Sequence, residues 1–200
     1  MSSYVIKCVL EPVDWDNIAS APLNECAWSP NPAPEASVQA VFIPDKGLVF
    51  HLKSFAAPTR AENWEPDSRV WEDSCLEVFL AFTENEYINL EANSNSALRA
   101  SVGLDRSDRY FLSSYNIEQP QLSALEGPDS WEIFLFVPSA MVRALYNIDL
   151  KPGVHFKGNF YSCGDLTPAP HYSAWNSVDT ATPDFHRPEF FGDLEISGQV

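Results

Sequence analysis

CLEVFLAF at residues 75–82 and EYINLEANS at 86–94 are two largely apolar runs separated by Thr83, Glu84 and Asn85. Two such runs around a short polar turn are typical of a β-hairpin. Apolar and polar residues alternate within each run, which is the period of a half-buried strand. The stretch therefore predicts two paired strands with one face turned toward a core.

The same pattern continues on both sides of this hairpin. Residues 38–44 and 47–55 predict a second hairpin, with Gly47 beginning its second strand. Residues 139–148 predict one short helix with Ser139 as its N-cap. Because the helices that parallel α/β folds need between their strands are missing, the chain predicts an all-β, two-sheet sandwich, formed as a single domain over 1–200. Further strands are predicted at 4–10, 97–103, 131–138, 154–163 and 191–197.

Composition narrows the ligand classes. The chain has 200 residues and a formal net charge of −16, so duplex nucleic acid and anionic membrane surfaces would be repelled. Residues 1–4 are not followed by the basic region and long apolar stretch of a signal peptide. This indicates a cytoplasmic protein, or a secreted or periplasmic one if a leader was removed. The four cysteines form no CxxC pair, so their spacing gives no zinc or redox signature. Because no signal peptide is seen, free thiols are expected, with two disulfides as the alternative in an oxidising compartment.

Polar residues gather on one face of several predicted strands. Asn89 and Glu91 oppose the apolar row of their strand, and Asn159 and Tyr161 do so in 154–163. Short amides and aromatic residues are the groups that match sugar hydroxyls, because each hydroxyl both donates and accepts hydrogen bonds. The alternatives are a solvated outer face or a buried polar network beneath a loop.

Tryptophans add a second carbohydrate signal. Trp131 begins an apolar strand and is expected in the core, whereas Trp64, Trp71 and Trp175 lie in polar segments. An indole face packs well against the C–H face of a pyranose, with polar groups satisfying the edges of the sugar. Alternatively, each of these loop tryptophans covers the hydrophobic core and does not contact a ligand.

Four segments carry a family resemblance: VWEDSCLEVFL at 70–80, YINLEAN at 87–93, GNFYSCGD at 158–165, and HYSAW at 171–175 with PDFHRPEFFG at 183–192. In these segments the chain resembles the family 9 carbohydrate-binding modules. The resemblance implies an immunoglobulin-like, two-sheet antiparallel β-sandwich that binds a saccharide, and structural calcium in some members, whose ligands it does not assign here.

The resemblance also implies a site. Trp71 and Trp175 match the two tryptophans that clamp a terminal sugar, Glu77 matches the acidic residue six positions after the first, and Arg99 matches a basic sugar contact. Asn159 and His171 are added to the predicted ligand-binding residues from their faces and positions in the sequence.

Two other functions compete with a binding module that does no chemistry. A hydrolase acting on O-glycosyl compounds needs two carboxyl groups flanking a sugar, and Glu77 and Glu91 on neighbouring strands are candidates. A haem domain would take its axial ligands from the histidines or a methionine. The candidates for these ligands are His51, His155, His171, His186 and Met141.

Overall fold

The computed structural model describes residues 2–26, 28, 31–56 and 59–198. Strands dominate it, with one α-helix among the described residues, α1 (Ser139–Tyr146). The prediction of an all-β chain with one short helix is therefore confirmed. The strands are β1 (Ser3–Cys8), β2 (Ala21–Pro22), β3 (Ala36–Ile43), β4 (Gly47–Ser54), β5 (Cys75–Ala81), β6 (Tyr87–Asn93), β7 (Leu98–Gly103), β8 (Arg109–Phe111), β9 (Gln121–Glu126), β10 (Trp131–Pro138), β11 (His155–Cys163), β12 (Tyr172–Ala174) and β13 (Gly192–Ile196).

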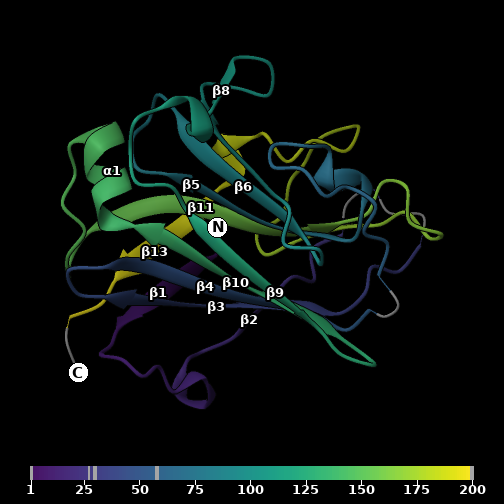
Figure 1. The fold of residues 1–200 in the computed structure, drawn as a ribbon, viewed down its shortest axis with the longest axis horizontal. Coiled ribbons are helices and arrows are strands. Elements are labelled where there is room, and N and C mark those ends of the chain that lie inside the picture. The colour runs from purple at the N-terminus through teal and green to yellow at the C-terminus, as the bar shows by residue number, and fades with distance from the viewer. Residues whose placement is uncertain (1, 27, 29–30, 57–58, 199–200) are drawn as a thin grey trace.

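One strand joins two groups of strands into a single path. The order is β8-β7-β6-β5-β11-β13-β1-β3-β4-β10-β9, with β12 beside β11 and β2 beside β3. Residues 3–6 of β1 run parallel to β13, and Lys7 and Cys8 run parallel to β3. The other described pairings are antiparallel, so the antiparallel prediction fails only at β1. Figure 1 shows β5, β6 and β11 on one side of the molecule and β3, β4 and β10 on the other.

The main core lies between these two groups of strands. Phe50 of β4 and Phe160 of β11 meet with ring centroids 5.7 Å apart. Trp131 is buried in the same cluster, as its apolar strand predicted. Burying large aromatic and aliphatic side chains between two strand layers is the main favourable contribution to such a fold. One face of β5, β6 and β11 is used for this purpose, which leaves their other face for a site.

Helix α1 corrects a detail of the sequence prediction. The N-cap residue is Pro138, and Ser139 is the first helical residue. The Ser139 amide donates to the carbonyl of Lys46 at 2.8 Å, so the hairpin turn between β3 and β4 holds the beginning of the helix. Asn147 ends the helix in the left-handed conformation, a common end for helices.

Several short elements lack a sequence signal, namely β2, β8, β9 and β12. Their pairing depends on a neighbouring strand, and three of them are only two or three residues long. The thiols of Cys8, Cys75 and Cys163 are buried, and that of Cys26 is exposed. No helix among the described residues has the length and apolar character needed to cross a bilayer.

Candidate functional site

Polar side chains from four neighbouring strands form a row on the sheet face that points away from the main core. The residue register pairs Tyr161 of β11 with Glu77 of β5, Glu77 with Glu91 of β6, and Glu91 with Arg99 of β7. Because side chains alternate along a strand, partners in register point to the same face. The alternation in the sequence thus predicted a shared polar face correctly.

The segment before β5 is fixed over this face by a buried carboxylate. Asp73 accepts hydrogen bonds from the amides of Glu62 and Asn63 at 3.1 and 3.0 Å and from Asn93 Nδ2 at 2.8 Å, and it pairs with Arg60. These donors hold the pKa of Asp73 below its usual value despite its burial, which by itself raises that pKa. The oxygens of Asp73 are therefore occupied by N–H donors, and its role is to position the neighbouring Trp71.

A pocket of about 300 Å³ opens between this segment, the 164–186 region and the polar face. Trp71, Tyr172 and Phe185 supply its aromatic walls. Phe185 stacks on Tyr161 with ring centroids 4.0 Å apart and has Trp28 against it at 5.7 Å, so this wall is rigid. The pocket therefore combines aromatic surface with a polar floor.

Asn89 lies at the centre of a hydrogen-bonded network in the floor. Its Nδ2 donates to Glu91 Oε1 at 2.6 Å, and its Oδ1 accepts from Ser101 Oγ at 2.6 Å and from Arg109 Nε at 2.7 Å. Arg109 also donates to the carbonyl of Tyr87 at 2.9 Å and lies over the Tyr87 ring at 4.2 Å. Because each member of this buried network is hydrogen-bonded to another, the polar groups that face the pocket are held in fixed positions.

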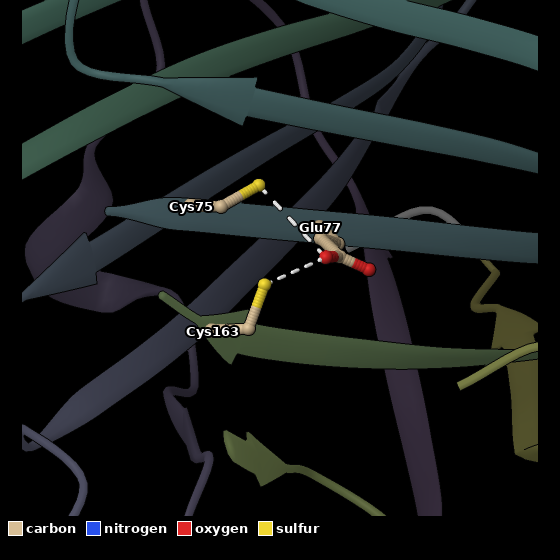
Figure 2. A group of neighbouring side chains, drawn as sticks. All are labelled: Cys75, Glu77 and Cys163. Atoms are coloured by element: carbon tan, nitrogen blue, oxygen red, sulfur yellow. Dashed lines mark hydrogen bonds between the residues drawn. The ribbon is translucent and has the colours of Figure 1, made fainter. Parts of the chain in front are cut away.

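Glu77 has a different environment from Glu91. It is 3 % exposed, and its Oε1 lies 3.1 Å from Cys163 Sγ and 3.8 Å from Cys75 Sγ, two thiols that donate to it (Figure 2). Burial and the neighbouring Glu91 raise the pKa of Glu77 well above the usual value. Burial also raises the pKa of the Cys75 thiol to about 12. Glu77 is thus protonated more readily than an exposed glutamate, and a protonated carboxyl group offers both a donor and an acceptor.

Arg99 is held in place by two aromatic rings. Its guanidinium carbon lies 4.9 Å from the centre of the Trp71 ring and 4.8 Å from that of Phe111, and Nη1 donates to the carbonyl of Asp67 at 2.8 Å. Such stacking fixes the plane of the guanidinium group. Its other N–H groups lie in the same plane, so their directions are fixed as well.

His186 closes another side of the pocket. Its Nδ1 lies 2.8 Å from the hydroxyl of Tyr87. Burial, followed by the charges of Arg109, Arg106 and Arg99, lowers the pKa of His186 to about 3. The ring is therefore neutral at physiological pH, and a neutral imidazole offers one donor and one acceptor.

Three of the predicted site residues, Trp71, Glu77 and Arg99, do line the pocket. Trp175 does not, and this corrects the predicted clamp. Its indole is 7 % exposed and belongs to the main core, with ring centroids 5.4 Å from Phe160 and 6.4 Å from Tyr4. Tyr172, at the start of β12, lines the pocket, whereas Trp175 lies one residue beyond the end of β12, where its amide donates to the carbonyl of Phe160 at 2.9 Å.

Asn159 and His171, the other two predicted ligand-binding residues, lie outside the lining of this pocket. Asn159 is buried and bonds the Asn176 segment, with Nδ2 2.9 Å from the Asn176 carbonyl and Oδ1 2.9 Å from its amide. His171 Nδ1 lies 3.0 Å from the carbonyl of Ala169. Both side chains use their hydrogen bonds to shape the loop after β11.

The prediction missed several pocket residues, including Arg109, Tyr172 and Phe185. Tyr172 had a usable signal, since alternation in HYSAW separates it from Trp175. Arg109 had no such sequence signal, because the turn at 104–108 brings it to the floor. In this turn, Asp105 Oδ1 accepts hydrogen bonds from two following backbone amides at 2.7 and 2.9 Å. Of the haem candidates, His186 lies in the pocket and Met141 in the main core.

The model of the carbohydrate-binding family 9 matches residues 8–196. The chain belongs to carbohydrate-binding family 9. Comparison with curated proteins gives no match.

Solved structures share the fold of this family 9 chain. A protein from Bacteroides uniformis, to which carbohydrate binding is attributed by inference, is similar over 97% of this chain and 98% of its own, with 26% identity and a TM-score of 0.82. A family 9 module from Caldicellulosiruptor kristjanssonii in complex with glucose is similar over 100% of this chain and 97% of its own, with 12% identity and a TM-score of 0.71. A family 9 module from the same organism in complex with cellotriose is similar over 100% of this chain and 95% of its own, with 13% identity and a TM-score of 0.68.

Proposed function

We propose that this protein binds the end of a mono- or oligosaccharide in the pocket between Trp71, Tyr172 and the polar floor. The observation that carries the proposal is the combination in one pocket of aromatic walls and immobilised carboxyl, amide and guanidinium groups. A pyranose needs this combination, since its C–H faces are apolar and its edges are covered with hydroxyls.

The pocket residues divide into aromatic groups that pack on the sugar ring and polar groups that bond its hydroxyls. Trp71 supplies an aromatic surface for the sugar ring, and Tyr172 replaces Trp175 as the second one. Glu77 and Arg99 bond hydroxyls, for which a protonated carboxyl and a stacked guanidinium are suited. Affinity is expected to be modest, because the sugar hydroxyls must be desolvated before they bond the protein.

Calorimetric titration with glucose and cellotriose tests this function. We expect Trp71→Ala to abolish measurable heat of binding. Trp64→Ala is the matched control, since Trp64 lies seven residues earlier, is 70% exposed and does not line the pocket, and it should bind as the wild type does. Equal binding by both variants and the wild type, or binding by none of a wider panel of sugars, would contradict the proposal.

A glycoside hydrolase is the second candidate, and the direct pairing of Glu77 with Glu91 favours it. Side chains opposite each other in an antiparallel pair lie on the same face with Cβ atoms about 4.5–5.5 Å apart, so both carboxyl groups can reach one sugar. Both groups, however, lie in the floor rather than on either side of the pocket. Release of nitrophenol from nitrophenyl glycosides by the wild type, and its loss in Glu77→Gln, would establish this activity.

The arrangement of the two groups of strands also belongs to the proposal. We propose an immunoglobulin-like two-sheet sandwich in which β1 is shared by both sheets. The position of the main core between β4 and β11 supports it.

A further inference from the structure

Cys75, Glu77 and Cys163 form a compact cluster of metal-binding atoms at the pocket floor. One donor atom from each lies within 4.8 Å of the other two. All three side chains are buried, and they come from two paired strands, with Cys75 directly opposite Cys163 in the register. Figure 2 shows both sulfur atoms directed toward the same carboxylate oxygen. Strand pairing, rather than a loop, therefore fixes the geometry.

The distances suit a tetrahedral ion. With Zn–S bonds of about 2.3 Å and Zn–O bonds of about 2.0–2.2 Å, neighbouring ligand atoms in a tetrahedral site lie roughly 3.5–3.8 Å apart. Glu77 Oε1 lies 3.1 Å from Cys163 Sγ and 3.8 Å from Cys75 Sγ. The third spacing, between the two sulfur atoms, is within 4.8 Å, so the three donor atoms surround a volume that one ion can occupy.

The charge around Glu77 also favours a cation. Among the described residues, the side chains that donate to Glu77 are the thiols of Cys75 and Cys163, and Glu91 and Asp165 place further negative charge nearby. A buried carboxylate without a cationic partner is costly, so it must hold either a proton or a cation. Two sulfur ligands favour a thiophilic ion such as Zn²⁺ over Ca²⁺ or Mg²⁺, which prefer oxygen.

We propose that Cys75, Glu77 and Cys163 form a binding site for a thiophilic divalent cation of the Zn²⁺ class. The two cysteines bind as thiolates, so their protons and any proton on Glu77 leave to the buffer. Glu77 and Cys163 line the pocket, so the fourth coordination position faces it. Three protein ligands with an open position are the arrangement of sites that accept an exogenous ligand.

Zinc titration of reduced, metal-free protein tests the site, with the other two cysteines as controls. Cys8→Ser/Cys26→Ser keeps the two site thiols and should bind one Zn²⁺ per chain as tightly as the wild type, measured by calorimetry and native mass spectrometry. Cys75→Ser/Cys163→Ser and, separately, Glu77→Gln should weaken binding by about a hundredfold or more. With Co²⁺, the first double variant should show sulfur-to-cobalt charge transfer and the absorption of a tetrahedral ion.

Two outcomes would overturn the proposal. One is failure of the wild type and Cys8→Ser/Cys26→Ser to bind Zn²⁺ while their thiols remain reduced. The other is undiminished binding in Cys75→Ser/Cys163→Ser or Glu77→Gln, with thermal unfolding confirming that each variant folds. Glucose binding is measured separately with Trp71→Ala, which retains all three metal ligands, so failure of the metal site and failure of the saccharide proposal are distinguishable.

Discussion

Glu77 and Glu91 occupy directly opposed positions on β5 and β6, so that two buried carboxyl groups share one pocket floor. Their surroundings separate them. Glu91 has Arg99 opposite it in the register and accepts a hydrogen bond from Asn89. Among the described residues, the donors to Glu77 are two thiols. Burial raises the pKa of both carboxyl groups, so the pair takes up a proton more readily than exposed glutamates do.

Replacing Glu77 should change how stability depends on pH. The folded-state pKa of Glu77 is raised by burial and Glu91, whereas the unfolded chain has the ordinary value. Its contribution to stability is then fully present below the unfolded pKa and is lost as the pH rises through the folded one. Urea unfolding from about pH 4 to about pH 9 should show that Glu77→Gln loses less stability with rising pH than the wild type. Glu84→Gln, an exposed control, should follow the wild type; a Glu77→Gln curve parallel to both would contradict this reasoning.

Acidification should act on His186 in the opposite sense. Its pKa falls from 6.5 to about 3 on folding, so between these values the unfolded chain binds the extra proton and stability decreases as the pH falls. This group alone should cost about 2 kcal/mol at pH 5 relative to pH 7. His186→Gln keeps a partner for the Tyr87 hydroxyl and should remove that loss. Chemical denaturation at the two pH values measures the difference, and an unchanged loss in the variant would refute it.

Trp175→Ala should unfold the protein more readily rather than simply remove a sugar contact. Removing a buried indole that packs on Phe160 and Tyr4 costs about 3–5 kcal/mol. Trp64→Ala should change the free energy of unfolding by less than about 0.5 kcal/mol, since that side chain is exposed. Gly192→Ala should also destabilise, because its Cβ would lie 2.5 Å from the Trp175 ring. A stable Trp175→Ala protein would place the indole outside the core.

Arg109 should be needed for the floor although it was invisible in the sequence. Arg109→Ala leaves Asn89 Oδ1 and the Tyr87 carbonyl without their charged donor, at a cost of about 3 kcal/mol, and should weaken saccharide binding. Arg106→Ala is the control, since Arg106 lines the same pocket but is largely exposed, and it should change stability by less than about 0.5 kcal/mol. Denaturant unfolding and calorimetry of both variants make the comparison; equal effects would contradict it.

Residue patterns predicted the strands and the shared polar face because alternation with a period of two is a local property. Glu77, Asn89 and Glu91 were assigned to one face for this reason, and the register confirms it. The placement of Trp175 could not be predicted locally, because the polar residues around it give no sign that its indole packs in the main core. The place of Arg109 in the floor could not be predicted from alternation, because it depends on the turn around Asp105 that pairs β8 with β7.

The shared strand β1 has a consequence for biosynthesis. Its residues 3–6 pair with residues 193–196, whereas its next two residues pair with β3. β1 therefore completes its hydrogen bonds only after β13 has been synthesised, although its other partner, β3, follows it closely in the sequence. Until β13 arrives, one side of β1 is available to a chaperone or to another nascent chain.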